Sequence, residues 1–178
     1  YKTLMGMRWQ PSLQIIPHYE SEPLYINALK NSLNKKISEI NWKPDLIIAS
    51  YHGIPKKYFD KGDPYHCYCQ KTSRLLSEKF DSIPIKTTFQ SRFGPQEWLQ
   101  PYTDKTLEKL PNEGMKNILV ICPGFSSDCV ETLEEISIQG KESFIKNGGN
   151  NFDVVPCLND NDDHINLLEH LTQKFFSK

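Results

Sequence analysis

The sequence predicts an α/β fold, a single three-layer domain in which a parallel sheet of about four strands is flanked by helices. Patterns typical of strands alternate along the chain with patterns typical of helices, which favours a parallel sheet with right-handed crossovers. The run at residues 118–122 is too apolar for a strand with one face in water, so we expect a buried strand there. A length of 178 residues is enough for one domain with a real core.

Composition and charge exclude several classes of function. Apolar residues make up 38% of the chain and charged residues 24%, which is ordinary for a globular domain. The net charge of -1 gives no electrostatic reason to expect a nucleic-acid partner. No apolar run approaches the roughly 20 residues that cross a bilayer. The five cysteines cannot all pair within the chain, so we expect a reduced, cytoplasmic compartment.

The first elements follow from apolar spacing. Residues 13–17 are a short strand or a linker. A helix is predicted over residues 22–40, with Glu22 favouring its N-terminus. Its apolar residues recur at helical spacing: Leu24, Ala28, Leu33, Ile37 and Ile40. The strand at residues 46–50 is an apolar run that follows the helix-stopping Pro44.

The later elements continue the alternation. Asp63 is the expected N-cap of a second helix, with Pro64 at its first position. Further along, we expect a strand at 84–89, a helix near 103–110, the strand at 118–122, a helix at 128–146, a strand at 151–156 and a helix at 162–176.

A histidine and a glutamate follow two of these strands. Strand 46–50 leads through Tyr51 and His52 into a turn, and ligands of open α/β sheets bind outside the carboxyl ends of strands. A lone histidine there can equally be an ordinary loop residue bonded to backbone. If strands 46–50 and 118–122 are neighbours, His52 and Glu131 face each other across one crevice.

Glu131 has two competing interpretations that need no ligand. A helical wheel of residues 128–146 turns one set of side chains toward the sheet: Cys129, Leu133, Ile136, Gly140 and Phe144. Glu131 and Glu135 are four residues apart on the opposite side, where carboxylates are usually plain surface groups. Alternatively, Asp128 caps the helix and Glu131 reaches back to it as in a capping box.

Several ordered motifs identify a family. They are SYHGIP at 50–55, DKGDPY at 60–65, TFQSRFGP at 88–95, EWL at 97–99, PYTD at 101–104, CPGFSSDCVETLEE at 122–135 and PCLN at 156–159. Together they resemble ferrochelatase, the lyase that inserts iron(II) into a porphyrin in the last step of haem synthesis. The resemblance covers only the C-terminal half of that enzyme. It implies that residues 1–178 are one domain, and that an N-terminal partner domain supplies the opposite wall of the porphyrin cleft.

The resemblance implies that His52 and Glu131 are the catalytic pair and that both contact the metal. An imidazole nitrogen and a carboxylate suit an iron(II) ion that must be handed over, and a neutral histidine can accept a pyrrole proton. Which of the two takes the proton is left open. Asp128 and Glu135 are expected to relay the proton or to hold the waiting metal.

The remaining site residues are expected substrate contacts. Bending a flat macrocycle typically stores about 1–5 kcal/mol and needs flat walls, for which Trp98 and Tyr51 are the candidates. Trp98 is otherwise a core aromatic that closes its loop. Arg92 is expected to pair with a propionate, or else to be a solvated or capping residue. Gln90 and Ser91 are expected at the same mouth.

Porphyrin and Fe²⁺ are therefore the expected partners, with no permanently bound cofactor. Some ferrochelatases hold an iron–sulfur cluster through a cysteine-rich C-terminal extension; this chain ends without one, so we expect no cluster. His66, Cys67 and Cys69 offer three ligands but no second pair at zinc spacing. Cys129 replaces a histidine found in some relatives, which weakens any role for that position.

Three alternatives remain. A chelatase for another metal shares the scaffold, and a non-catalytic module could hold haem or porphyrin. A nucleotide binder lacks its glycine-rich phosphate loop here. The chain opens without an initiating Met, so we expect a piece of a longer protein. The resemblance implies that this piece is inactive alone, because the N-terminal half with the opposite wall of the cleft is absent. The hydrophobic substrate leads us to expect peripheral contact at the inner membrane as well.

Overall fold

The computed structural model describes residues 1–80 and 83–176. Its centre is a sheet of four strands, β1 (Leu46–His52), β2 (Ile85–Gln90), β3 (Asn117–Ile121) and β4 (Asn151–Val154). The strands lie in the order β2-β1-β3-β4, and each neighbouring pair is parallel. The predicted α/β class and four-stranded parallel sheet are confirmed.

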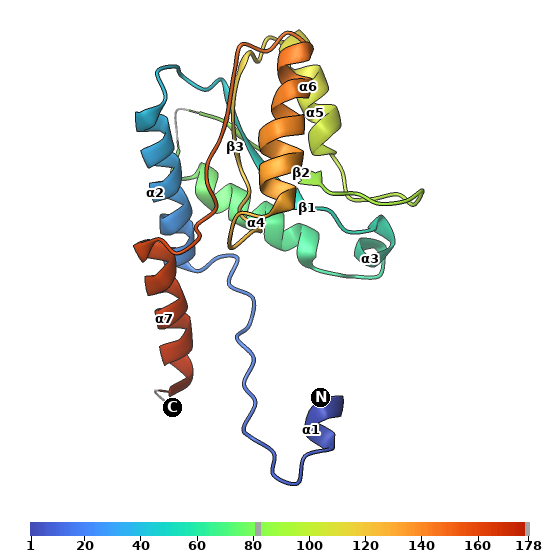
Figure 1. Ribbon diagram of the computed structural model, residues 1–178, viewed down its shortest axis with the longest axis vertical. Coiled ribbons are helices and arrows are strands. Elements are labelled where there is room, and N and C mark those ends of the chain that lie inside the picture. The colour runs from blue at the N-terminus through green and yellow to red at the C-terminus, as the bar shows by residue number, and fades with distance from the viewer. Residues whose placement is uncertain (81–82, 177–178) are drawn as a thin grey trace.

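Helices cover both faces of this sheet (Figure 1). One layer contains α2 (Pro23–Glu39), α4 (Tyr65–Ser77) and α7 (Asp162–Phe176). The other contains α5 (Thr103–Lys109), the 3₁₀ turn η1 (Leu110–Glu113), the π-helix η2 (Glu131–Gly140) and α6 (Lys141–Lys146). In the described part of the chain, no helix combines the length and the apolar character needed to cross a bilayer.

Alternation along β1 divides the core into two clusters. Ile47, Ala49 and Tyr51 pack with α2, α4 and α7 in the first cluster. Leu46 and Ile48 pack with α5, η2 and α6 in the second cluster. Successive side chains of a strand point to opposite faces, so an apolar run with no polar interruption is what a doubly covered strand requires.

The strand order places the switch point of the fold between β1 and β3. The chain crosses from β2, on one side of β1, to β3 on the other, and a crevice at such a reversal is where open α/β sheets bind ligands. Ala49 is opposite Ile121, the last residue of β3, whereas β1 continues to His52 by pairing with β2. His52 therefore stands beyond the carboxyl end of β3.

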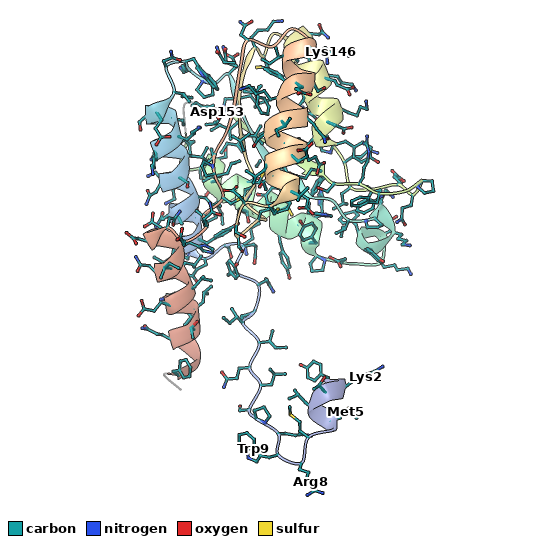
Figure 2. The ribbon with its side chains drawn as sticks, viewed as in Figure 1. Lys2, Met5, Arg8, Trp9, Lys146 and Asp153 are labelled. Atoms are coloured by element: carbon teal, nitrogen blue, oxygen red, sulfur yellow. The ribbon has the colours of Figure 1, made fainter. Side chains whose placement is uncertain are left out.

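Two short helices were not predicted. These are α1 (Lys2–Met5) and α3 (Lys56–Asp60). Residues 13–17 contain no strand, so the linker interpretation is the correct one. Together with α1 they form an extended arm that projects from the body of the fold, with Met5 and Trp9 exposed (Figures 1 and 2).

The helix predicted at 128–146 differs from expectation in its pitch. Its first ten residues form the π-helix η2, and only then does it continue as α6. The residues that are buried lie four apart: Thr132, Ile136, Gly140 and Phe144. The prediction that Leu133 faces the sheet is wrong, because its side chain is 54% exposed. The wider i→i+5 turn moves the inward position from 133 to 132.

Candidate active site at the carboxyl end of the sheet

His52 is the last residue of β1 and its side chain is half-buried. Its Nδ1 lies 2.7 Å from the carbonyl oxygen of Gly53. A carbonyl only accepts, so Nδ1 carries the hydrogen and the neutral ring presents Nε2 as an acceptor. The backbone bond expected of an ordinary loop histidine is thus present, and it sets the tautomer that a proton acceptor or metal ligand needs.

The turn after His52 is held from two sides. Tyr65 donates its hydroxyl to the His52 carbonyl oxygen at 2.8 Å. A Cβ on Gly53 would come within 2.9 Å of the Gln90 carbonyl oxygen, so the turn lies too close to β2 for any larger residue. These contacts fix the direction in which the imidazole leaves the sheet.

Glu131 is the first residue of η2, and its side chain is partly exposed. A hydrogen bond from the Cys129 side chain lowers the pKa of Glu131 below its ordinary value. Its own backbone N–H and the electrostatic interaction with the His52 side chain lower that pKa further. The carboxylate is therefore ionised at neutral pH.

The capping-box interpretation of Asp128 and Glu131 is wrong. The Asp128 N–H, which Glu131 would have to reach, donates instead to Asn159 Oδ1 at 2.9 Å. The Asp128 carboxylate accepts the Cys157 N–H at 3.1 Å and, at 3.3 Å, shares the Thr132 hydroxyl hydrogen with the Cys129 carbonyl oxygen. Burial raises the pKa of Asp128, but these bonds and one from Asn159 outweigh it and hold the pKa below its ordinary value.

Glu135 and Gln90 connect η2 to the end of β2. Glu135 accepts the Ser91 N–H at 2.7 Å and the Ser91 hydroxyl. Ser91 has a φ of 61°, a left-handed backbone that needs such support. Gln90 is 3% exposed, donates to the Glu131 carbonyl oxygen at 2.8 Å and accepts from Ser50 at 2.7 Å. Gln90 and Glu135 thus join the first turns of η2 to the end of β2, and their expected substrate and relay roles stay predictions.

Glu131 opens onto a cavity of about 550 Å³ between η2, α5 and the end of β2. Its acidic lining residues are Asp104, Glu108, Glu131, Glu134 and Glu135. Gln90, Ser91 and Arg92 also line it. We call it the acidic cavity. Phe93 and Val130 add apolar side chains that are 70% and 73% exposed. Sequence reasoning missed both, although each stands inside a quoted motif.

Arg92 and Trp98 have partners within the chain. Arg92 forms an ion pair with Asp104 at 2.7 Å and lies over the Tyr102 ring at 4.1 Å. Trp98 is 7% exposed and donates its indole N–H to the Phe93 carbonyl oxygen at 3.0 Å. The alternative of a core aromatic that closes its loop therefore describes Trp98 better than a bare porphyrin wall.

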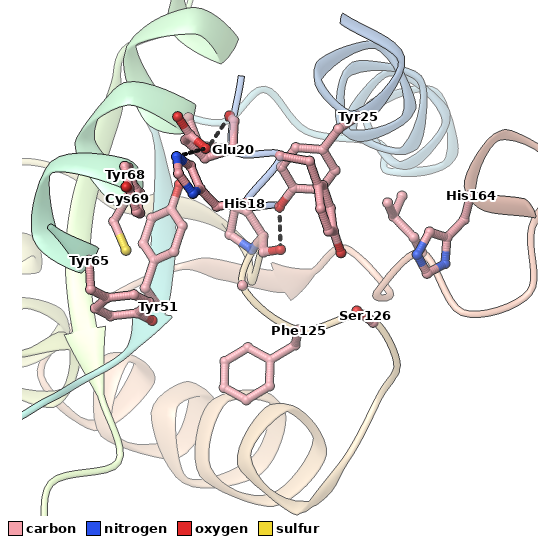
Figure 3. Close-up of a pocket in the computed structure, with 15 residues that line it drawn as sticks. His18, Glu20, Tyr25, Tyr51, Tyr65, Tyr68, Cys69, Phe125, Ser126 and His164 are labelled. Atoms are coloured by element: carbon pink, nitrogen blue, oxygen red, sulfur yellow. Dashed lines mark hydrogen bonds and ion pairs between the residues drawn. The ribbon is translucent and has the colours of Figure 1, made fainter. Parts of the chain in front are cut away.

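Tyr51 belongs to the other face of the sheet. Its hydroxyl lies 2.9 Å from Ser73 Oγ, and burial raises its pKa. With Tyr65 and Phe125 it lines a separate cavity of about 240 Å³ (Figure 3). Of the predicted site residues, Gln90, Arg92, Glu131 and Glu135 thus share the acidic cavity, with His52 electrostatically linked to Glu131. His52, Tyr51, Trp98 and Asp128 do not line that cavity.

The described residues contain no group of three or more His, Cys, Asp or Glu side chains placed to hold a metal ion. The His66-Cys67-Tyr68-Cys69 segment illustrates why spacing alone is insufficient. Cys67 is exposed and Cys69 is buried, while His66 stacks on Phe89. Helix α4 turns these side chains toward different surroundings.

Comparison with known proteins agrees with the motifs and the sheet. A family model described as Ferrochelatase matches residues 1–175. The chain is 54% identical over 176 residues to a ferrochelatase of Rhizobium meliloti (strain 1021), and 51% identical to one of Agrobacterium fabrum (strain C58). Each match covers 98% of this chain but only 52% and 51% of the relative, so the chain spans about half the length of these curated relatives. The chain belongs to the ferrochelatase family.

Proposed function

We propose that the protein to which this chain belongs inserts Fe²⁺ into a porphyrin, most simply protoporphyrin IX, to form haem. His52 and Glu131 act where the metal is transferred. The observation that supports this most directly is their placement at the switch point of the sheet: His52 ends β1, and Glu131 begins η2, the helix that follows β3. One supplies an oriented imidazole and the other an ionised carboxylate beside the acidic cavity.

The two side chains suit different parts of the reaction. The lowered pKa of Glu131 keeps a negative charge available to meet the incoming cation. The acidic cavity behind it concentrates divalent cations by its field. With Nδ1 donating to Gly53, His52 Nε2 is free to accept a pyrrole proton as the metal enters the ring. Nitrogen and oxygen ligands bind Fe²⁺ without the tight hold of thiolates.

The porphyrin needs walls on both sides. In this chain the exposed Phe93 and Val130 provide apolar surface next to Glu131, with Trp98 packed behind Phe93. We assign the opposite wall to the half of the protein that the relatives have and this chain does not cover. A porphyrin bound to one wall cannot be bent against the other, so this chain alone is inactive.

Replacing His52 by alanine in the full-length protein tests the assignment. We expect Fe²⁺ insertion to slow by about 10²–10⁴-fold, because proton transfer by a positioned side chain typically contributes that much. The measurement is the rate of porphyrin metallation followed by absorbance. His170→Ala is the matched control, since His170 lies on α7 with its side chain 42% exposed. Near-normal turnover of His52→Ala would remove His52 from the mechanism.

The same assay separates the alternatives. Preference for Co²⁺ or Ni²⁺ over Fe²⁺ in competition would assign the protein to another metal chelatase. A stable stoichiometric complex with porphyrin and no metal insertion would instead assign a binding module. Fe²⁺ insertion that is lost with His52 supports the proposed function.

A further inference from the structure

Asn159 lies in the loop between β4 and α7 and is not one of the site residues expected from the sequence. We propose that Asn159 is a positioning residue that acts through Asp128 to hold Glu131 in place, an inference that rests on the proposed function of Glu131. Asp128 on this view contributes its geometry and is not a proton or metal relay.

Asn159 and Asp128 form a reciprocal pair. The Asn159 side-chain amide donates to Asp128 Oδ2 at 2.8 Å, and its Oδ1 accepts the Asp128 N–H at 2.9 Å. The Asn159 N–H adds a third bond, to the Ser126 carbonyl oxygen at 2.9 Å. A side chain with both a donor and an acceptor is needed to match a carboxylate and the N–H beside it. The β4–α7 loop is thereby joined to the loop that precedes η2.

Asn159 is itself held in an unusual conformation. Its φ is 49°, in the left-handed region that asparagine tolerates better than most residues. The buried His164 donates from Nδ1 to the Asn159 carbonyl oxygen at 2.6 Å. His164 is in the first turn of α7 and lines the cavity shown in Figure 3. The loop is thus anchored to α7 on one side and to Asp128 on the other.

Asp128 transmits this anchoring to η2. Its Oδ1, at 3.3 Å, shares the hydroxyl hydrogen of the buried Thr132 with the Cys129 carbonyl oxygen at 3.1 Å, and Thr132 directly follows Glu131. The Thr132 hydroxyl oxygen in turn accepts the Cys129 N–H at 3.0 Å. Both carboxylate oxygens of Asp128 are therefore engaged by structural donors. Removing the Asn159 amide would free the segment that orients the Glu131 carboxylate.

Exchanging the two side chains provides the sharpest test. In the full-length protein, D128N alone places two amides face to face, and N159D alone places two carboxylates face to face. We expect each to lower kcat for Fe²⁺ insertion by at least about tenfold, with KM for porphyrin nearly unchanged. The double variant D128N/N159D restores a complementary pair and should return kcat to within about threefold of the wild type.

A second variant guards against misfolding of the exchanged pair. Asn159→Gly keeps the left-handed backbone available and removes only the amide, so we expect the same loss of kcat. When Glu131→Gln is already present, adding Asn159→Gly should lower kcat no further, because Asn159 acts through Glu131. Asn161→Ala is the matched control. It removes the acceptor for the His164 N–H at 2.8 Å, and it should lower Tm without lowering kcat.

Three results would overturn the inference. A double variant as inactive as D128N would show that the Asp128 carboxylate is itself required. Wild-type kcat in Asn159→Gly would show that the pair does not position Glu131, while the proposed function would stand. Absence of Fe²⁺ insertion in the wild type would remove the proposed function and this inference together.

Discussion

The charge state of the Glu131 carboxylate follows from its neighbours. A hydrogen bond from Cys129 is the largest influence, and it lowers the pKa. Cys129 thus stabilises the ionised form of Glu131, two residues further on, even though a cysteine cannot carry a proton as a histidine would. With its pKa below the ordinary value of about 4.3, Glu131 keeps its charge as the pH falls from neutrality and loses it only in more acidic solution.

Glu131→Gln isolates the role of that charge. The substitution keeps the size of the side chain and removes its negative charge, so we expect Fe²⁺ insertion to fall by about 10²-fold or more. Its unfolding midpoint should stay within the small range of surface substitutions. Metallation rates and thermal unfolding of the full-length variant provide the measurement. A change in thermal stability with a normal rate would instead indicate a structural role.

At the scale of elements, the π-helix η2 determines which side chains meet the sheet. Its inward positions lie four residues apart, so Glu131 and Glu135 flank the buried Thr132 and Ile136 at the edge of the sheet. An α-helical wheel places the two glutamates on the far side and Leu133 inward. Extended π-helical turns are uncommon and frequently occur at functional sites. The pitch of η2 therefore brings Glu135 within reach of Ser91.

A pair of alanine substitutions checks this pitch. Ile136 is 2% exposed, so Ile136→Ala should reduce the free energy of unfolding by about 2–5 kcal/mol. Leu133 is 54% exposed, so Leu133→Ala should change it by about 0.5 kcal/mol or less. Urea denaturation of both variants measures the difference. Similar large losses for both would favour the α-helical arrangement.

Element by element, local pattern predicted the strands better than it predicted the site. Buried parallel strands need continuous apolar runs, so residues 46–50 and 118–122 were recognisable without any partner. The extension of β1 to His52 depends on pairing with β2, which a local pattern does not contain. The burial of Trp98 and the Arg92–Asp104 ion pair are likewise contacts between segments, and no single motif reveals them.

At the scale of the whole molecule, helices cover both faces of the four-stranded sheet, and the candidate site lies at the carboxyl end of its strands. The two core clusters on either face of the sheet are made of buried residues from the described part of the chain. The exposed Phe93 and Val130 stand beside Glu131, where we assign the porphyrin and the second wall. We therefore expect the isolated chain to fold but not to catalyse metal insertion.

The isolated chain tests this separation. We expect residues 1–178 to unfold cooperatively but to insert Fe²⁺ into porphyrin at a rate indistinguishable from the uncatalysed reaction. Co-expression with the remaining half of the protein should restore insertion by restoring the opposite wall. Denaturation and metallation assays on the same sample provide the comparison. Turnover by the isolated chain would contradict the assignment of the second wall.

The sequence by itself determined the fold class, the family and the position of a histidine and a glutamate just after two strands. Each depends on residues close together in the chain: apolar runs, turn residues and short motifs. Only the tertiary structure decided that β1 and β3 are neighbours, that η2 has π pitch, and that Asp128 is bonded to Asn159. These features arise from contacts between segments far apart in sequence, whose energies no local pattern records.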